Sequence, residues 1–197
     1  MGPIAVPGSY QVKLTANGKT FTASFEIRED PRVKTSQADL QKQFDLALQI
    51  RDAVDADHKA ELEIRDVRTQ LEALKKRLKE GARAKDVTSA ADDFEKKMAA
   101  IESEIVQPKL KSSEDALNYP IKLSSKLMAL EETVESADTA PSAQCYEVFK
   151  MLDAQLQDQL AKWKQLQSKD LASLNGTMRK EKIEPVMVVE PEREDTE

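Results

Sequence analysis

The chain begins with a segment in which apolar and polar residues alternate, a pattern typical of β-strands. In YQVKL and again in FTASFEI every second residue is apolar, so each run would present one apolar face. Asn17-Gly18 lies between the two runs, and both residue types tolerate the positive φ of a tight hairpin turn. The pattern therefore predicts a β-hairpin over residues 10–27, ended by Asp30-Pro31 because the residue before a proline is driven toward extended conformations.

A hairpin of two strands is marginal in water, because it needs further strands or a packed helix to bury its apolar face. We expect this face either to find cover on the helices that follow or to stay exposed. In the second case the hairpin would be open to pairing with another chain. The residues on this face are Tyr10, Val12, Leu14, Phe21, Ala23, Phe25 and Ile27.

After Ser36 the apolar residues recur every three or four positions, which is the period of an amphipathic helix. Ser36 is a plausible N-cap with Asp39 three residues on, a variant of the capping box. The stripe thins over residues 55–61 and then continues as a heptad-like seam from Ile64 to Leu78. Pro108 and Asn175-Gly176 are the natural ends of later helices. Four helices are predicted, over about residues 36–81, 87–107, 120–137 and 139–175.

Helices with stripes of this width bury them most simply in an antiparallel bundle. The predicted fold class is therefore mainly α, with an N-terminal β-hairpin followed by a bundle of about four helices, of which the first and last are long. The predicted domains are the hairpin over residues 1–31, the bundle over residues 32–179 and an acidic tail over residues 180–197. We expect the tail to be disordered apart from some docking by Val186, Met187 and Val188.

Composition and charge argue against several classes of protein. Charged residues make up 34% of the chain, aromatic residues 5%, and the net charge is −6. An acidic chain is a poor match for nucleic acid, whose phosphates need a surplus of Lys and Arg. It contains no apolar run of about 18 residues that could span a membrane, and MGPIAVPGSY lacks the features of a signal peptide. The single cysteine, Cys145, excludes an internal disulfide and a zinc cluster.

The candidate catalytic residues are few. His58, the only histidine, stands among Asp55, Asp57 and Glu61, yet a metal site needs three or four ligands, so a surface or structural histidine is favoured. Cys145 stands at the start of the fourth predicted helix, but a nucleophilic cysteine needs a histidine partner and the only histidine belongs to another predicted helix, so Cys145 is interpreted as a buried small apolar residue. We predict no catalytic, cofactor-binding or metal-binding residue.

Several charged and aromatic groups have an equally simple interpretation. Asp92-Asp93 and Glu131-Glu132 are carboxylate pairs on helices, where they are most often solvated, and Asp92 with Lys96 and Asp93 with Lys97 would form i, i+4 ion pairs. A basic cluster could contact acidic partners but is expected to be a solvated helix end, and most aromatic residues fall on helical stripes. The cluster is Lys75, Lys76, Arg77, Lys79, Arg83 and Lys85. The other conspicuous residues are the aromatic Tyr119, Phe149 and Trp163, together with Pro120.

Two stretches together resemble a known family. PGSYQVKLTANGKTFTASFEIREDPRVKTSQADLQKQFDLALQIRD is similar to the segment that follows the β-propeller in large bacterial proteins with sortilin-like BNR (Asp-box) repeats, often labelled glycosyl hydrolases. LNYPIKLSSKLMALEETVESADTAPSAQCYEVFKMLDAQLQDQLAKW resembles the helical end of those chains. The resemblance reaches to about Asn175 and is most specific in DPRV and LNYPIKL.

The resemblance implies a C-terminal module that lacks the propeller. The propeller would carry any glycan chemistry, so no functional residue is carried over, and the hairpin would be the remnant of an Ig-like or sandwich module. The partner would be an upstream propeller or sandwich domain or another protein, outside the cytoplasm if the resemblance holds. The expected function is a non-catalytic accessory or interaction module. The alternatives are a self-contained coiled-coil adaptor that homodimerises and, ranked last, a hydrolase in its own right.

Overall fold

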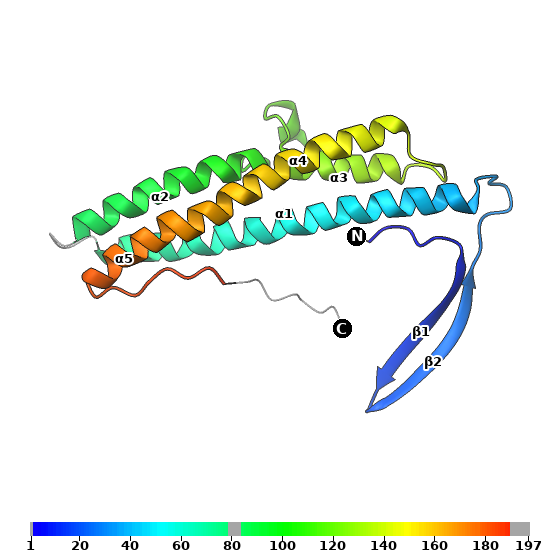
Figure 1. Cartoon of the computed structure of the whole chain (residues 1–197), viewed down its shortest axis with the longest axis horizontal. Coiled ribbons are helices and arrows are strands. Elements are labelled where there is room, and N and C mark those ends of the chain that lie inside the picture. The colour runs from blue at the N-terminus through cyan, green and yellow to red at the C-terminus, as the bar shows by residue number, and fades with distance from the viewer. Residues whose placement is uncertain (1, 79–83, 190–197) are drawn as a thin grey trace. The chain divides into compact units, whose positions relative to one another are not determined.

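The computed structural model describes residues 2–78 and 84–189 of the chain. It confirms a mainly helical fold with an N-terminal antiparallel hairpin and long first and last helices (Figure 1). The elements in chain order are β1 (Gly8–Ala16), β2 (Lys19–Ile27), α1 (Gln37–Leu78), α2 (Ala84–Ile105), the 3-10 helix η1 (Ser113–Leu117), α3 (Leu123–Val134), α4 (Ala143–Gln165), the π-helical segment η2 (Leu166–Leu171) and α5 (Ala172–Lys180).

The chain divides into two compact units. Unit 1 comprises residues 1–52 and 128–150, and unit 2 comprises residues 53–127 and 151–197. Helices α1, α3 and α4 each contribute residues to both units.

The hairpin of unit 1 confirms the predicted strands and turn. Tyr10 faces Phe25 and Leu14 faces Phe21 across the ladder, so the apolar residues of both strands share one face. Asn17 and Gly18 adopt φ values of 50° and 73°, the positive values that a two-residue turn of this hand requires. The rings of Tyr10 and Phe25 stack with centroids 5.9 Å apart.

Side-chain hydrogen bonds tie the start of α1 to the end of α3 in unit 1. The Gln43 side-chain amide donates to the carbonyls of Val134 and Ala137, at 2.6 and 2.7 Å. Ser36 accepts a hydrogen bond from the Asp39 N–H at 3.2 Å, as the predicted N-cap requires. The segment before β1 is held to the same region, because the Ile4 N–H donates to Glu135 Oε1 at 2.8 Å.

Unit 2 has a continuous apolar core built on the stripe of α1. This stripe packs with α2 and with the helical run from Trp163 onward. The indole N–H of Trp163 donates to Glu63 Oε2 at 2.7 Å, which pairs the polar atom of an otherwise buried ring. The most enclosed core residues are Ile64, Val67, Leu71, Leu74, Val87, Ala91, Phe94, Met98, Ile105, Trp163 and Met178.

The predicted helix end at Asn175-Gly176 is wrong, because α5 continues to Lys180. Asn175 is buried, and its side-chain amide is hydrogen-bonded to the backbone of Val186. Asn and Gly stop helices when they adopt positive φ, and neither residue does so here. The third helix likewise begins at Leu123, three residues later than Pro120 suggested.

The helix ends instead in a Schellman motif at Lys182. The Ile183 N–H donates to the Met178 carbonyl at 2.9 Å and the Lys182 N–H to the Arg179 carbonyl at 3.1 Å, the paired bonds that define this motif. Lys182 has φ 57°, a left-handed conformation in which a Cβ atom is unfavourable. The chain then returns along the bundle through residues 183–189.

We predict that Lys182→Gly raises the free energy of unfolding by about 0.5–1 kcal/mol, because glycine adopts this conformation without a Cβ penalty. Chemical denaturation monitored by circular dichroism would measure the change. The matched control is Lys180→Gly, which places glycine in the last helical turn and should lower the free energy of unfolding by about 1 kcal/mol. Equal losses of unfolding free energy in both variants would contradict the assignment of Lys182 as the left-handed residue of a Schellman motif.

Candidate functional site

The structure leaves the two sequence-derived nucleophile or base candidates as isolated groups. His58 is exposed on α1. The predicted full burial of Cys145 is wrong, because it is only half-buried in the first turn of α4, where its Sγ lies 3.4 Å from the exposed Ser142 Oγ. Ser142 also accepts a hydrogen bond from the Cys145 N–H at 3.3 Å, so these contacts serve to cap α4. Within residues 2–78 and 84–189 there is no group of three or more His, Cys, Asp and Glu placed to hold a metal ion.

The carboxylates of α2 form ion pairs other than the predicted i, i+4 pairs. Asp92 pairs with Lys75 of α1 at 2.5 Å, and Lys75 also contacts Glu95 at 2.5 Å. Asp93 pairs with Lys96 at 3.6 Å, and Lys97 pairs with Asp170 of η2. The predicted Asp92–Lys96 and Asp93–Lys97 pairs are therefore wrong: Asp92 and Lys97 pair with residues of other helical segments, and Asp93 pairs with Lys96 at i, i+3 on its own helix.

The basic cluster and the aromatic residues are spread over different environments. Lys75 is engaged in the ion pairs just described, Lys76, Arg77 and Lys85 are exposed, and Lys79 and Arg83 lie outside the described residues. Trp163 is a core residue, as predicted. Tyr119 lies under the ammonium group of Lys109, 5.1 Å from its ring centroid. These residues do not define a single binding patch.

Asp57 is the one candidate that sequence reasoning placed only as a neighbour of His58. It lies on α1 in unit 2, is fully buried, and neither carboxylate oxygen has a hydrogen bond of full geometry. Burial raises the pKa of this carboxyl from 3.8 to about 6, because the charged form loses its hydration. The Ser124 hydroxyl of α3 partly offsets the rise in pKa, nearby Glu61 adds to it, and His58 opposes it. A signal existed in the sequence, since Asp57 occupies an apolar-stripe position between Ala53 and Ala60.

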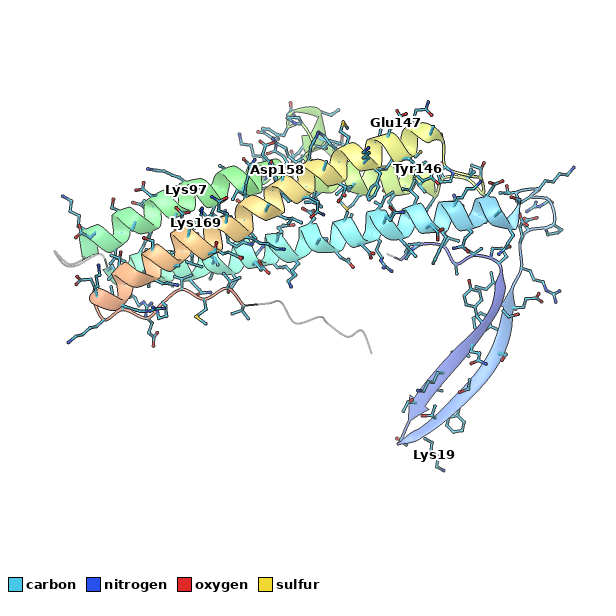
Figure 2. The ribbon with its side chains drawn as sticks, viewed as in Figure 1. Lys19, Lys97, Tyr146, Glu147, Asp158 and Lys169 are labelled. Carbon is cyan, nitrogen blue, oxygen red and sulfur yellow. The ribbon has the colours of Figure 1, made fainter. Side chains whose placement is uncertain are left out.

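The apolar face of the hairpin is the most prominent exposed surface. Val12, Leu14, Phe21 and Phe25 retain 52%, 60%, 58% and 49% of their possible exposure. In the described part of the chain β1 and β2 form a sheet of two strands with two open edges. The opposite face is polar and carries Lys13 and a Thr15–Thr20 hydrogen bond of 3.2 Å. Lys19 extends from the tip of the hairpin (Figure 2).

A cavity of about 170 Å³ lies at the root of this hairpin. Its lining is mixed, with apolar residues such as Val6, Ile27 and Leu40 beside charged residues such as Arg28 and Asp30. Glu29 also lines it, and one of its carboxylate oxygens is buried with no hydrogen-bond partner among the described residues. The hairpin root is thus hollowed and carries one polar atom whose hydrogen-bonding capacity is unused.

Comparison with protein-family models, with curated proteins and with solved structures found no match for the chain. Within the described residues no helix is long and apolar enough to cross a membrane. The surface that the geometry distinguishes consists of the exposed apolar face of the hairpin, its two open edges and the hollow at its root.

We predict that the folded chain loses stability as pH rises from about 4 to 7. The pKa of Asp57 is higher in the folded state than in the unfolded state, so the folded chain binds more protons between these two pKa values. Stability from this group is complete below pH 3.8 and is lost as pH passes through about 6, by about 3 kcal/mol at most. Asp57→Asn should remove this loss and raise the free energy of unfolding at pH 7 by about 1–3 kcal/mol. Urea denaturation at several pH values measures it.

The matched control for Asp57 is Asp55→Asn on the exposed side of the same helix, which should leave the pH profile unchanged. An Asp57→Asn chain that keeps the full pH dependence of the parent would rule out Asp57 as its source.

We predict that Phe21→Ala lowers the free energy of unfolding of the bundle by less than about 0.5 kcal/mol, because its ring covers no core residue. Phe25→Ala should weaken the hairpin by about 1 kcal/mol, since it also loses the stack on Tyr10. The comparison is Phe94→Ala in the core of unit 2, expected to lose about 3–5 kcal/mol. Thermal and chemical unfolding would rank the three, and a loss at Phe21 equal to that at Phe94 would mean that its face is covered in solution.

Proposed function

We propose that this chain is a non-catalytic interaction module whose hairpin docks onto a β-rich partner domain. The observation that carries the proposal is the row of half-exposed apolar side chains on one face of β1 and β2, with polar side chains on the other. A two-stranded sheet of this kind is stabilised when another surface covers its apolar face. The chain's own described helices do not cover it.

The hairpin offers a partner two kinds of contact. Its open edges present unpaired backbone N–H and C=O groups, which can add to the edge of another sheet. Its apolar face offers Val12, Leu14, Phe21 and Phe25 for burial against the partner, while the face with Lys13 and Thr22 stays in water. A partner sheet that meets both requirements would extend the hairpin and cover it at the same time.

The resemblance to the region after the propeller of sortilin-like BNR-repeat proteins supports a specific partner. It implies that an upstream propeller or sandwich domain supplies the missing strands, and that the helical bundle is a spacer or docking element. Hydrolase activity, where such proteins have it, would then belong to the preceding domain and not to this chain.

A second candidate is a homodimeric adaptor. Tyr146, Val148 and Met151 are individually exposed apolar residues on α4, and exposed apolar residues are positions that a second copy could cover. Figure 2 shows Tyr146 near the start of this helix, beside the charged Glu147. This arrangement is less continuous than the hairpin face, so we rank it second.

The test uses the longer gene product. If codons upstream of Met1 encode a β-rich domain in the same reading frame, we expect amide hydrogen exchange in β1 and β2 to slow by at least ten-fold in the longer product relative to this chain. Phe21→Lys with Phe25→Lys should abolish the slowing, because two buried charges oppose docking. Thr22→Lys with Ser24→Lys, on the polar face of the same strand, should not.

Two outcomes would decide against the first candidate. Exchange rates in the hairpin that are identical in the longer product and in this chain would show that no domain docks there. A chain that is dimeric by light scattering, and becomes monomeric on Met151→Lys but not on the paired Phe changes, would favour the adaptor.

A further inference from the structure

The segment after α5 is held on unit 2 by two side-chain amides that form hydrogen bonds with its backbone. Asn175 of α5 donates to the Val186 carbonyl and accepts from the Val186 N–H, both at 2.8 Å. Gln70 of α1 does the same for Met187, donating to its carbonyl at 2.7 Å and accepting from its N–H at 2.9 Å. Each amide therefore satisfies both backbone groups of one residue, as the edge of a β-sheet would. This recognition places no demand on the side chain of either residue.

Side-chain contacts of the segment alternate with a period of two. Val186 is 4% exposed, Met187 is 60% exposed, Val188 packs against the core and Val189 points to solvent. Ile183 is partly buried against the core. The alternation is that of an extended peptide with one face down, and Val186 is its deepest anchor. Figure 1 shows this stretch following α5 as an irregular chain rather than a helix.

A hollow borders the segment on one side. A cavity of about 450 Å³ remains between α1, α5 and the segment, and its walls include Ala73, Arg77 and Met178 together with Glu184 and Pro185 of the segment. The cationic Arg77 and the anionic Glu184 border the same hollow, so its charge suits an acidic residue two positions before the buried anchor.

We propose that the groove between α1 and α5 is a binding site for extended peptides of a partner protein, with the pattern acidic–any–apolar–any–apolar, and that the chain's own residues 184–188 occupy it as an intramolecular competitor. The side-chain amides of Gln70 and Asn175 orient the peptide by hydrogen bonds to its backbone. The pocket that holds Val186 binds the apolar anchor, and Arg77 favours an acidic residue. The site lies in unit 2 and does not depend on the hairpin or on the function proposed for it.

The chain's own residues 184–188, called the cis segment below, are suited to exchange with a partner peptide. The segment is entered through Lys182 in the left-handed conformation, which is unfavourable for a lysine and is relieved on release. Val186 is its most deeply buried side chain, whereas Ile183 and Val188 are only partly buried, so a charge at position 186 should release the segment. A tethered segment still competes strongly, because its effective concentration is in the millimolar range for a short linker.

The test uses the full chain and a fluorescein-labelled peptide with the sequence of residues 183–189, followed by fluorescence anisotropy. Val186→Asp should release the cis segment, and this variant is expected to bind the peptide saturably and at least ten-fold more tightly than the parent chain. Val189→Asp, a change of the same kind at an exposed position, should bind as weakly as the parent. Circular dichroism of both variants verifies that the helices are intact.

Further variants identify the groove. Adding Gln70→Ala to Val186→Asp should weaken peptide binding at least five-fold, whereas adding Gln49→Ala should not, because Gln49 contacts only the carbonyl of Asp45 on its own helix. The unrelated peptide Asp-Ala-Ile-Gln-Ile should bind within ten-fold of the native sequence, and its Lys-Ala-Ile-Gln-Ile counterpart more weakly.

Three results would overturn the proposal. The first is an absence of saturable binding to the folded Val186→Asp chain, and the second is equal binding by this variant and the parent. The third is a parent chain that is dimeric and becomes monomeric on Val186→Asp, which would assign the groove to the segment of a second copy instead of a partner peptide.

Discussion

The burial of the apolar stripe of α1 is the constraint on which the rest of the chain depends. In unit 2, Ile64, Leu71 and their neighbours on this helix form the core with α2 and the C-terminal helical run. In unit 1 the same helix buries Leu46 and Ile50. Each later helix has an apolar face that needs this stripe or a neighbour of it. The hairpin has an apolar face of its own, yet its rings remain exposed. The helices therefore bury their apolar stripes, whereas the apolar face of the hairpin stays exposed.

The elements that local pattern determines were predictable, and those that depend on tertiary contacts were not. The turn at Asn17-Gly18 and the stripe from Ile64 to Leu78 follow from spacing alone. The prediction that a helix ends at Asn175-Gly176 is wrong, because the Asn175 side-chain amide is hydrogen-bonded to the backbone of Val186 and does not end the helix. A residue with a turn preference can stand within a helix when a tertiary contact favours it.

The candidate sites divide along the same line. The apolar face of the hairpin was visible in the sequence, and only its exposure required the structure. Docking by Val186 was expected from its apolar character. The side-chain hydrogen bond from Gln70 to Met187 joins residues 117 positions apart, and no local sequence pattern predicts such a pair. Asp57 could have been found, because a carboxylate at an apolar-stripe position is either paired or shifted in pKa. The resemblance to sortilin-like BNR-repeat proteins stays a prediction.

The two proposed recognition surfaces lie in different units, and each combines apolar side chains with backbone hydrogen-bonding groups. The hairpin would donate its own edge, and the α1–α5 groove accepts the edge of another segment. For the groove, the apparent association constant for a partner equals the intrinsic association constant multiplied by the fraction of chains in which the cis segment has left. That fraction depends on the anchor Val186 and on the strained Lys182. Changes at either residue therefore tune access to the groove without altering its walls, so the segment works as an adjustable competitor.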